Sequence, residues 1–303
     1  MALPPRPARV ATLAPAVRRV LAENPSPMTY WGTNSYVVGS GEVAVIDPGP
    51  ADPDQIAAIL GALSPGETVS HIFVTHAHLD HSPGAALLAA ATGAPVLAYG
   101  DAQAGRSAQM TALAARGGLA GGEGVDAGFT PDRTLADSEI TAHGDWQLEA
   151  LWTPGHFGNH LAFALPARRG LFCGDLVMGW ASSLVSPPDG DLAAFMASLA
   201  RLATREDQVF YPGHGEVIAA PARRLAELRA HREMRGRQIA DALRSAPGSA
   251  AELAQRIYVE TPAALLPAAA RNVLAHLIEM ASKNEAAFDA ELRADSVFSA
   301  PQE

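Results

Sequence analysis

The feature that most restricts the fold of this chain is an alternation of short apolar runs and longer helical patterns over its first two thirds. Runs of about four to seven residues bounded by glycine or proline, such as EVAVIDPG and GLFCGD, are typical of strands. Between such runs, PDQIAAILGAL and DLAAFMASLARLA indicate helices, and Asp191 is suited to cap the second of these. The alternation therefore predicts an α/β layered structure.

Two segments depart from this alternation. Residues 103–128 are rich in glycine, and we expect a mobile or irregular cover there. Beyond residue 220, one long helical pattern begins at Pro221, which is suited to a first helical turn, and ends before Pro247. Two shorter helical patterns follow it. We therefore expect a larger domain over residues 1–220 and a small, mostly helical domain over residues 221–303.

Composition and charge exclude some classes of protein. No apolar run approaches the roughly 20 residues that cross a bilayer, so we do not expect a membrane-spanning protein. The net charge is −10, with 32 acidic against 22 basic residues. Such a field repels phosphate backbones, so binding of nucleic acid would need a local basic patch.

The expected location is the cytoplasm. The first 20 residues carry arginines and no acid, which resembles a transit peptide in charge, but their prolines interrupt any long amphipathic helix. A single cysteine, Cys173, allows no internal disulfide, which agrees with a reducing compartment. We expect Cys173 to be a core residue rather than a reactive thiol.

Four side chains that can bind a metal follow the apolar run HIFV within six positions. They are His76, His78, Asp80 and His81, and neutral imidazole and carboxylate are ligands that zinc-like ions prefer. If Ile72–Thr75 form a strand, alternation sends both His76 and His78 to one face, and a turn returns Asp80 and His81 toward the same point. Surface histidines beside a helix cap are the alternative, which suits one histidine better than this group.

Three further donors lie just past apolar runs. His156 follows LEALWTPG, Asp175 ends GLFCGD and His214 follows VFYPG. Each has a glycine beside it, which lets the backbone turn tightly and the side chain point into a shared site at the sheet edge. Together with the first cluster, five histidines and two aspartates are enough for two metal ions that share one carboxylate.

The motifs GTNSYVV, VIDPGP, THAHLDH, TPGH, CGD and YPGHG occur in this order between residues 17 and 220, and they resemble the metallo-β-lactamase superfamily. The resemblance implies an αββα sandwich, with two sheets between helix layers and the metals at one edge. It also implies a ligand set of His76, His78 and His156 on one zinc, Asp80, His81 and His214 on the second, and Asp175 bridging the two. Asp47 would orient a ligand rather than bind metal.

The C-terminal part is similar to that of the branch around lactamase-beta-like protein 2, which carries a winged-helix-like domain and includes an endoribonuclease. We expect a dinuclear zinc-dependent hydrolase, with Mn or Fe as possible metals, in which a hydroxide bridging the ions attacks the substrate. Asp80 and Asp175 are the expected catalytic residues, and Asp80 could return the proton. The expected substrate is a small ester, thioester, lactone or lactam, and a homo-oligomer is possible.

Two alternatives stay open. One is an endoribonuclease that acts on single-stranded RNA, and the other is a non-catalytic metal-binding or DNA-binding protein. Either nucleic-acid function would draw on the helix that begins at Pro221, where basic residues are concentrated. These are Arg223, Arg224, Arg229, Arg232, Arg235, Arg237 and Arg244. A solvent-exposed face is the favoured explanation for them, and a phosphate-binding stripe is the alternative.

Three more side chains have two equal interpretations each. Tyr30 and Trp31 either form an aromatic wall for a substrate or pack in the interior. His160 either lines the site or has a structural role.

Overall fold

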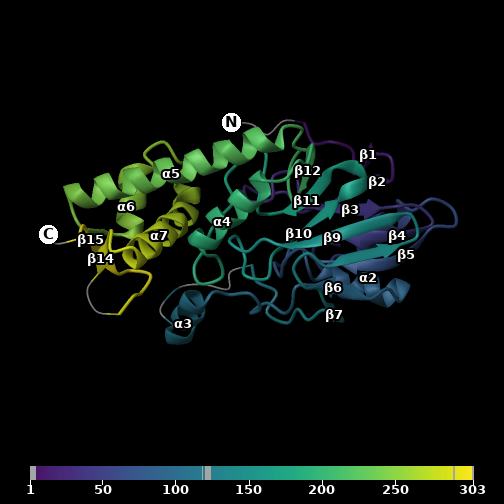
Figure 1. Cartoon of the computed structure of the whole chain (residues 1–303), viewed down its shortest axis with the longest axis horizontal. Coiled ribbons are helices and arrows are strands. Elements are labelled where there is room, and N and C mark those ends of the chain that lie inside the picture. Colours follow the sequence, from purple (N-terminus) through teal and green to yellow (C-terminus); the bar gives the residue numbers. More distant parts are fainter. Residues whose placement is uncertain (1–4, 118, 120–123, 289–290, 302–303) are drawn as a thin grey trace.

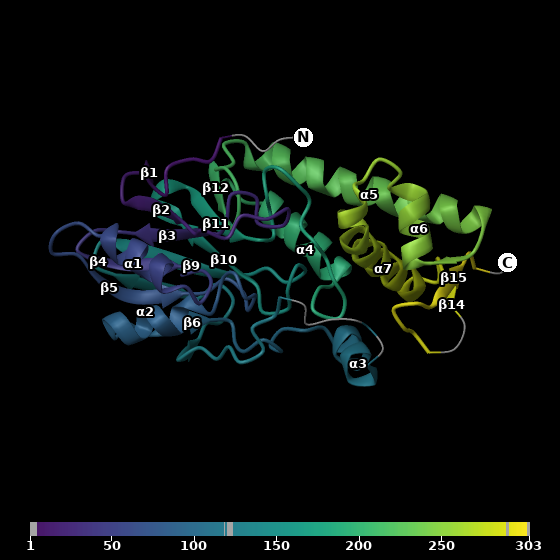
Figure 2. The same ribbon diagram turned by 180° about the vertical axis from the view of Figure 1, so that it is seen from behind.

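The computed structural model describes residues 5–117, 119, 124–288 and 291–301. Two β-sheets pack face to face, and helices cover the outer face of each sheet (Figures 1 and 2). This is the predicted αββα sandwich. A smaller group of helices and short strands follows it at the C-terminal end of the chain.

The first sheet has the strand order β1-β2-β3-β4-β5-β6-β7. Neighbouring strands from β1 to β4 are antiparallel, and those from β4 to β7 are parallel. Helices α1 (Pro53–Gly61) and α2 (Gly84–Thr92) connect the parallel strands β4, β5 and β6. The strands are β1 (Val10–Ala14), β2 (Val17–Leu21), β3 (Asn34–Val38), β4 (Glu42–Ile46), β5 (Thr68–Phe73), β6 (Val96–Ala98) and β7 (Arg133–Thr134).

The second sheet has the order β12-β11-β10-β9-β8. Strands β11 and β12 are parallel, and helix α4 (Leu192–Ala203) connects them. As predicted, Asp191 caps this helix, because its side chain accepts a hydrogen bond from the Ala194 N–H. The strands are β8 (Ile140–His143), β9 (Trp146–Trp152), β10 (Leu161–Leu165), β11 (Gly170–Gly174) and β12 (Val209–Pro212), with a 3-10 turn η1 (Pro166–Arg168) after β10.

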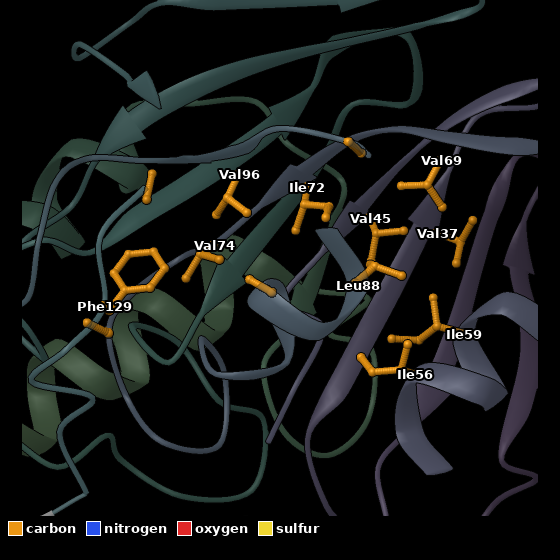
Figure 3. Close-up of a cluster of buried hydrophobic side chains, with 14 of the residues drawn as sticks. Val37, Val45, Ile56, Ile59, Val69, Ile72, Val74, Leu88, Val96 and Phe129 are labelled. Carbon is orange, nitrogen blue, oxygen red and sulfur yellow. The ribbon is translucent and has the colours of Figure 1, made fainter. Parts of the chain in front are cut away.

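Apolar side chains fill each space between the layers. Figure 3 shows the cluster between the first sheet and its helices, where Val45 and Ile72 from strands meet Ile59 and Leu88 from α1 and α2. Burial of each such side chain stabilises the fold by roughly 1.5–3 kcal/mol. Since both faces of this sheet are covered, every residue of β3 is buried, so burial along this strand is continuous and does not alternate.

Helix α5 (Pro221–Ser245) begins at the predicted proline and spans roughly 38 Å. Its first half contributes Leu225 and Leu228 to the core beneath α4, and its second half contributes Ile239 and Leu243 to the C-terminal core. The helix thus runs from the sandwich to the C-terminal group (Figure 1). Among the described residues, no helix is both long enough and apolar enough to cross a bilayer.

The C-terminal group combines helices with a small sheet, in the order β13-β15-β14. The two shorter helices lie where the sequence predicts them. The group contains α6 (Ala250–Ile257), the 3-10 turn η2 (Ala263–Leu265), α7 (Leu266–Ser282), β13 (Gly248–Ser249), β14 (Ala287–Phe288) and β15 (Val297–Ser299). The division of the chain at residue 220 remains a prediction.

The irregular cover predicted for residues 103–128 is wrong for part of that segment. Helix α3 (Ala108–Arg116) begins after Ser107, whose hydroxyl accepts a hydrogen bond from the Met110 N–H. Met110 and Leu113 are buried against the C-terminal helices, so tertiary packing stabilises this helix despite the glycines around it. Residues 118 and 120–123 lie outside the described part of the chain.

Candidate metal centre

The structure brings all seven predicted ligand side chains to one edge of the sandwich. They are His76, His78, Asp80, His81, His156, Asp175 and His214. The first four lie on the loop between β5 and α2, and the others follow β9, β11 and β12. One detail of the prediction is wrong: β5 ends at Phe73, so His76 and His78 converge from a loop and not through strand alternation.

Two glycines explain how the backbone can approach this centre so closely. Gly174 ends β11 with a φ of 47°, a left-handed conformation that turns the chain and presents Asp175. A Cβ on Gly213 would lie 2.3 Å from Oδ1 of Asp175, so no side chain fits there. The glycines beside the predicted donors therefore have a steric role.

The side chains of His76, His78 and His156 form the first group of donors, named here the three-histidine group. Nδ1 of His78 lies 2.9 Å from Nε2 of His76 and 3.1 Å from Nε2 of His156. Ligands about 2.0–2.1 Å from a tetrahedral zinc ion lie about 3.3 Å apart. The spacing of these nitrogens is therefore close to that of a zinc site.

Asp80, His81 and His214 form a second group, named here the aspartate group. Nε2 of His214 lies 3.2 Å from Oδ2 of Asp80 and 3.3 Å from Nε2 of His81. The spacing again matches tetrahedral ligation. Asp80 is the more exposed of the two carboxylates, with 28% of its side chain accessible against 10% for Asp175.

The carboxylate of Asp175 lies between the two groups. Its Oδ2 is 3.3 Å from Nε2 of His214 and 3.8 Å from Nε2 of His156, and its Oδ1 is 3.4 Å from Nε2 of His81. Oδ1 is buried and has no hydrogen-bond partner in the described part of the chain. A buried oxygen without a partner is costly, and a cation at this point would satisfy it.

Hydrogen bonds outside the centre fix the protonation of three histidine rings. Nδ1 of His156 donates to the carbonyl oxygen of Leu184 at 2.7 Å, and Nδ1 of His214 donates to that of Gly32 at 3.2 Å. Nδ1 of His81 donates to Oδ2 of Asp47 at 2.9 Å. These partners can only accept, so Nδ1 of each ring carries a proton, and Nε2 is the nitrogen that faces the centre and can bind a metal ion.

Asp47 fixes the ring of His76 as well, through Thr75. Its carboxylate accepts the Thr75 N–H and the Thr75 hydroxyl, both at 2.7 Å. The hydroxyl oxygen, 2.9 Å from Nδ1 of His76, therefore acts as acceptor toward that ring. Nε2 of His76 again faces the centre without a proton. The predicted role of Asp47, which is to orient ligands, agrees with these contacts.

The electrostatics of the two groups differ. Burial lowers the pKa of each histidine in the three-histidine group, and the pKa of His78 falls to about 3. Burial also acts to lower the pKa of His214, but the carboxylates of Asp175 and Asp80 outweigh it and raise that pKa to about 9. The pKa of His81 is raised for the same reason. The aspartate group thus attracts positive charge, as a proton or as a metal ion.

The donor set fits a transition-metal centre. Imidazole nitrogens and two carboxylates that face one another need positive charge among them, either as protons or as metal ions. Zinc-like ions prefer this mixture of nitrogen and carboxylate oxygen, whereas Mg²⁺ and Ca²⁺ prefer oxygen alone. The residues of this chain can therefore hold divalent metal.

Two supporting residues are not evident as such from the sequence. Nε2 of His160 accepts the backbone N–H of Asp175 at 3.2 Å, so this buried ring holds the central carboxylate in place and its structural interpretation is the better one. Asn159 accepts the Ala77 N–H through Oδ1, and its amide nitrogen donates to the carbonyl oxygens of Gly100 and Asp101. The hydrogen-bond partners of both residues lie elsewhere in the sequence, so these roles become visible only in the structure.

Three further predictions concern residues near the centre. Cys173 is fully buried and its thiol donates to the Val177 carbonyl oxygen, as expected of a core residue. Trp31 is buried, which favours packing. Tyr30 is partly exposed and stacks on Trp180, with ring centroids 4.8 Å apart, so it is placed to form a wall.

The solvent-exposed face predicted for the arginines of α5 is wrong for some of them. Arg232 is only 2% exposed, and Arg235 lies over the ring of Tyr258, 4.1 Å from its centroid. Arg224 donates to the carbonyl oxygens of Met178 and Ala181. These side chains bind neighbouring parts of the same molecule and do not form a free phosphate-binding stripe.

Comparison with known proteins agrees with this architecture. Residues 28–214 match a family model described as "Metallo-beta-lactamase superfamily", and residues 249–291 match one described as "Beta-lactamase associated winged helix domain". The second match confirms the predicted winged-helix character of the C-terminal group. The resemblance inferred from the motifs is confirmed by both.

Relatives share this organisation over most of their length. The beta-lactamase-like protein 2 homolog of Drosophila melanogaster is 30% identical over 281 residues, which cover 89% of this chain and 89% of that protein. A lactamase-like protein of Penicillium aethiopicum is 32% identical over 270 residues, covering 86% and 78%. A metallo-beta-lactamase family protein from Thermus thermophilus has the same fold, with a TM-score of 0.76, 24% identity and coverage of 95% and 100%.

Proposed function

This chain belongs to the metallo-beta-lactamase superfamily, and from this premise we propose that it is a dinuclear zinc-dependent hydrolase of small esters, thioesters, lactones or lactams. The observation that supports the proposal most directly is the convergence of inward-facing ring nitrogens and two carboxylates on two adjacent centres. Such a donor set needs positive charge, and two ions would supply it.

We assign one ion to the three-histidine group and the second to the aspartate group, with Asp175 shared by both. When bound, such a pair of ions supplies a nucleophile from water near neutral pH and stabilises negative charge on the reacting centre. Asp175 is buried between the groups and would hold them at a fixed separation. Asp80 is the accessible carboxylate, so it is the residue placed to return a proton to the leaving group.

A pocket whose aromatic lining contacts Gly215, next to His214, supports a small substrate. It has a volume of about 370 Å³, within the size range of small-molecule sites, and Tyr30, Trp180 and Glu216 are among the residues that line it. Trp180 lies close to Gly215, the neighbour of His214: a Cβ on that glycine would be only 2.7 Å from the Trp180 ring. An apolar or aromatic part of a substrate could stack there while its reactive bond reaches the metals.

RNA is the less favoured substrate. The net charge of −10 opposes a polyanion, and several arginines of α5 are bound to neighbouring carbonyl oxygens and rings. The non-catalytic alternative would gain support from a missing ligand, but the chain carries the complete set of seven. Hydrolysis of a small molecule is therefore the first function to test.

The test is a turnover screen of zinc-loaded protein against thioesters, lactones, β-lactams and single-stranded RNA, together with zinc analysis. We expect about two ions per chain and turnover of one small-molecule class. His78→Ala should reduce turnover by more than the roughly 10- to 100-fold caused by loss of an outer hydrogen-bond partner. His143→Ala is the matched control, since that histidine lies on β8, away from the centre.

The outcomes separate the parts of the proposal. One ion per chain in excess zinc would contradict the dinuclear centre. Two ions without turnover of any small substrate would contradict the hydrolase, and turnover of RNA alone would put the endoribonuclease first.

We also propose a cytoplasmic location. It is supported by the single cysteine, which leaves the fold without internal disulfides, and by the burial of its thiol, which raises the pKa of Cys173. Fractionation of source cells tests this location, and recovery of the protein from an oxidising compartment would contradict it.

A further inference from the structure

Residues 176–186, part of the loop between β11 and α4, link the candidate metal centre to the C-terminal helices. This segment is named here the β11–α4 loop. At its centre, the carbonyl oxygen of Leu184 accepts the hydrogen bond from Nδ1 of His156 at 2.7 Å. This bond decides which nitrogen of His156 carries the proton and how the ring is oriented. Whatever fixes Leu184 therefore fixes a ligand of the three-histidine group.

Two residues of the C-terminal helices hold the peptide groups on either side of Leu184. Arg232 on α5 donates from Nη2 to the carbonyl oxygen of Ser183 and from Nη1 to Oδ1 of Asn272 at 2.9 Å. The same Oδ1 of Asn272, on α7, accepts the N–H of Val185 at 3.0 Å. Since both partners of this atom are donors, the side-chain amide must present its oxygen to them.

A single peptide plane connects Asn272 with His156. The carbonyl of Leu184 and the N–H of Val185 belong to the same peptide unit, which is planar and trans. The oxygen and the hydrogen therefore point in opposite directions from one rigid peptide plane. Asn272 holds the N–H end and His156 is bound at the oxygen end, so the direction of one hydrogen bond sets the direction of the other.

The burial of Arg232 shows that this contact is a defined one. Arg232 is 2% exposed, and its guanidinium carbon lies over the ring of Phe195, 5.1 Å from the ring centroid. Burial lowers the pKa of Arg232 to about 10, so the group stays charged near neutral pH. A buried charge is tolerated only where hydrogen bonds satisfy it, and here the acceptors are Ser183 and Asn272. The pair is thus tied to the β11–α4 loop.

We propose that Arg232 and Asn272 are positioning residues of the metal centre, which act through the Leu184–Val185 peptide unit to orient His156. The C-terminal helices would then complete the three-histidine group, in addition to any role in binding a partner. The inference rests on the metal centre of the proposed function, but not on hydrolysis. Its consequence is that changes on α7 alter one metal position and spare the other.

Asn272→Ala is the direct test, with Asn272→Asp as the conservative variant. Alanine removes the acceptor, whereas a carboxylate oxygen can still accept from both Val185 and Arg232. We expect Asn272→Ala to weaken the ion at the three-histidine group by about 10- to 100-fold and to leave the aspartate group within about twofold. Asn272→Asp should restore the affinity. Titration with zinc under chelator competition measures both sites.

Cobalt substitution identifies which ion is lost. The cobalt absorption of Asn272→Ala at limiting metal should resemble that of His156→Ala and not that of His214→Ala. Leu277→Ala is the matched control for destabilisation. Leu277 also lies on α7 and is fully buried, but it packs in the C-terminal core and not in the cluster that contains residues of the β11–α4 loop. This variant should lower the melting temperature and leave both metal affinities unchanged.

Three outcomes would overturn the proposal. They are unchanged affinity of both sites in Asn272→Ala, equal weakening of both sites, and failure of Asn272→Asp to restore binding. Should Asn272→Ala fold poorly, Arg232→Met provides a second variant that keeps an apolar stem and removes the bonds to Ser183 and Asn272, and it should weaken the ion at the three-histidine group in the same way. Absence of hydrolysis by the unchanged protein would contradict the proposed function, while these metal affinities would still decide the role of Asn272.

Discussion

Gly213 lies directly against the central carboxylate. A Cβ at this position would lie 2.3 Å from Oδ1 of Asp175 and 2.7 Å from Cε1 of His81, both of which belong to the centre. We therefore expect Gly213→Ala to displace Asp175 and to reduce turnover by on the order of 100-fold, as misplacement of a reacting group by about 1 Å does. Steady-state kinetics and zinc analysis measure the effect.

Gly61→Ala is the control for that substitution. Gly61 is the last residue of α1, and a Cβ at this position would meet no atom within 4 Å. The control variant should retain full activity and gain slightly in stability. Wild-type kinetics in Gly213→Ala would mean that Asp175 is not the carboxylate that holds the two groups together.

Protonation of His214 gives the two metal positions different pH dependence. Its pKa of about 9 lies above the unfolded value near 6.5, so without metal this histidine stabilises the fold below pH 6.5 and loses that contribution as the pH rises through 9. Zinc must displace the proton. Because the pKa of His81 is raised as well, we expect affinity at the aspartate group to rise by at least about tenfold per pH unit up to about pH 9.

The three-histidine group should show little pH dependence over the same range, because the pKa values of its histidines are lowered and the rings are already neutral. Chelator-competition titrations at several pH values measure both positions. Two equal slopes would contradict the difference in charge between the groups.

At this scale the sequence predicts the ligands better than their supports. Each ligand follows an apolar run and adjoins glycine or other donors, and that pattern is local. Asn272 supports His156 although the two residues are more than one hundred positions apart in the sequence. A single asparagine in a helical pattern does not indicate such a contact. Arg232 resembles its exposed neighbours in sequence, and only packing buries it.

Among the elements, strand β2 shows where the pattern of apolar and charged residues fails to predict a buried strand. Strand β2 reads VRRVL, and two adjacent arginines argue against a buried strand. In the structure Arg19 is 5% exposed and donates to the Ala8 carbonyl oxygen, while Arg18 reaches the Ala62 carbonyl oxygen and Glu67. Long side chains can thus be buried along their stems when carbonyl oxygens receive the charged end. The strands EVAVI and GLFCG carry no arginine, and their apolar runs predict them.

Helix α5 supplies a prediction that separates its exposed arginines from its buried ones. Arg229, Arg237 and Arg244 are exposed, so their joint replacement by Gln should leave hydrolysis of a small substrate within about twofold. Arg232 is excluded from the set because it is buried. Affinity for single-stranded RNA should already be weak at physiological salt and should not change.

Salt dependence of RNA binding gives the decisive measurement for this helix. Each phosphate neutralised on a single strand adds about −0.7 to the log–log slope, so three lost contacts would reduce the slope by about two. Tight RNA binding that the triple variant abolishes would favour the endoribonuclease over the small-molecule hydrolase.

For the whole molecule, metal should contribute much of the stability. Each ion present at about a thousand times its dissociation constant stabilises the folded state by about 4 kcal/mol. We therefore expect a chelator to lower the melting temperature by on the order of 10 °C. Zinc should restore it and magnesium should not, because the donors are mainly nitrogen. An unchanged melting temperature after chelation would contradict a metal centre built into the fold.

The length of α5 also bears on how such proteins can diverge. Leu225 and Leu228 pack beneath α4, while Ile239 and Leu243 pack in the C-terminal core. A recombination event at residue 220 that replaces the winged-helix group would therefore also replace part of the sandwich core. A crossover after Gly236 would keep Arg232 with its own loop but bring a foreign α7. Lineages that exchange these segments must therefore co-vary the contact between Asn272 and Val185, or lose it.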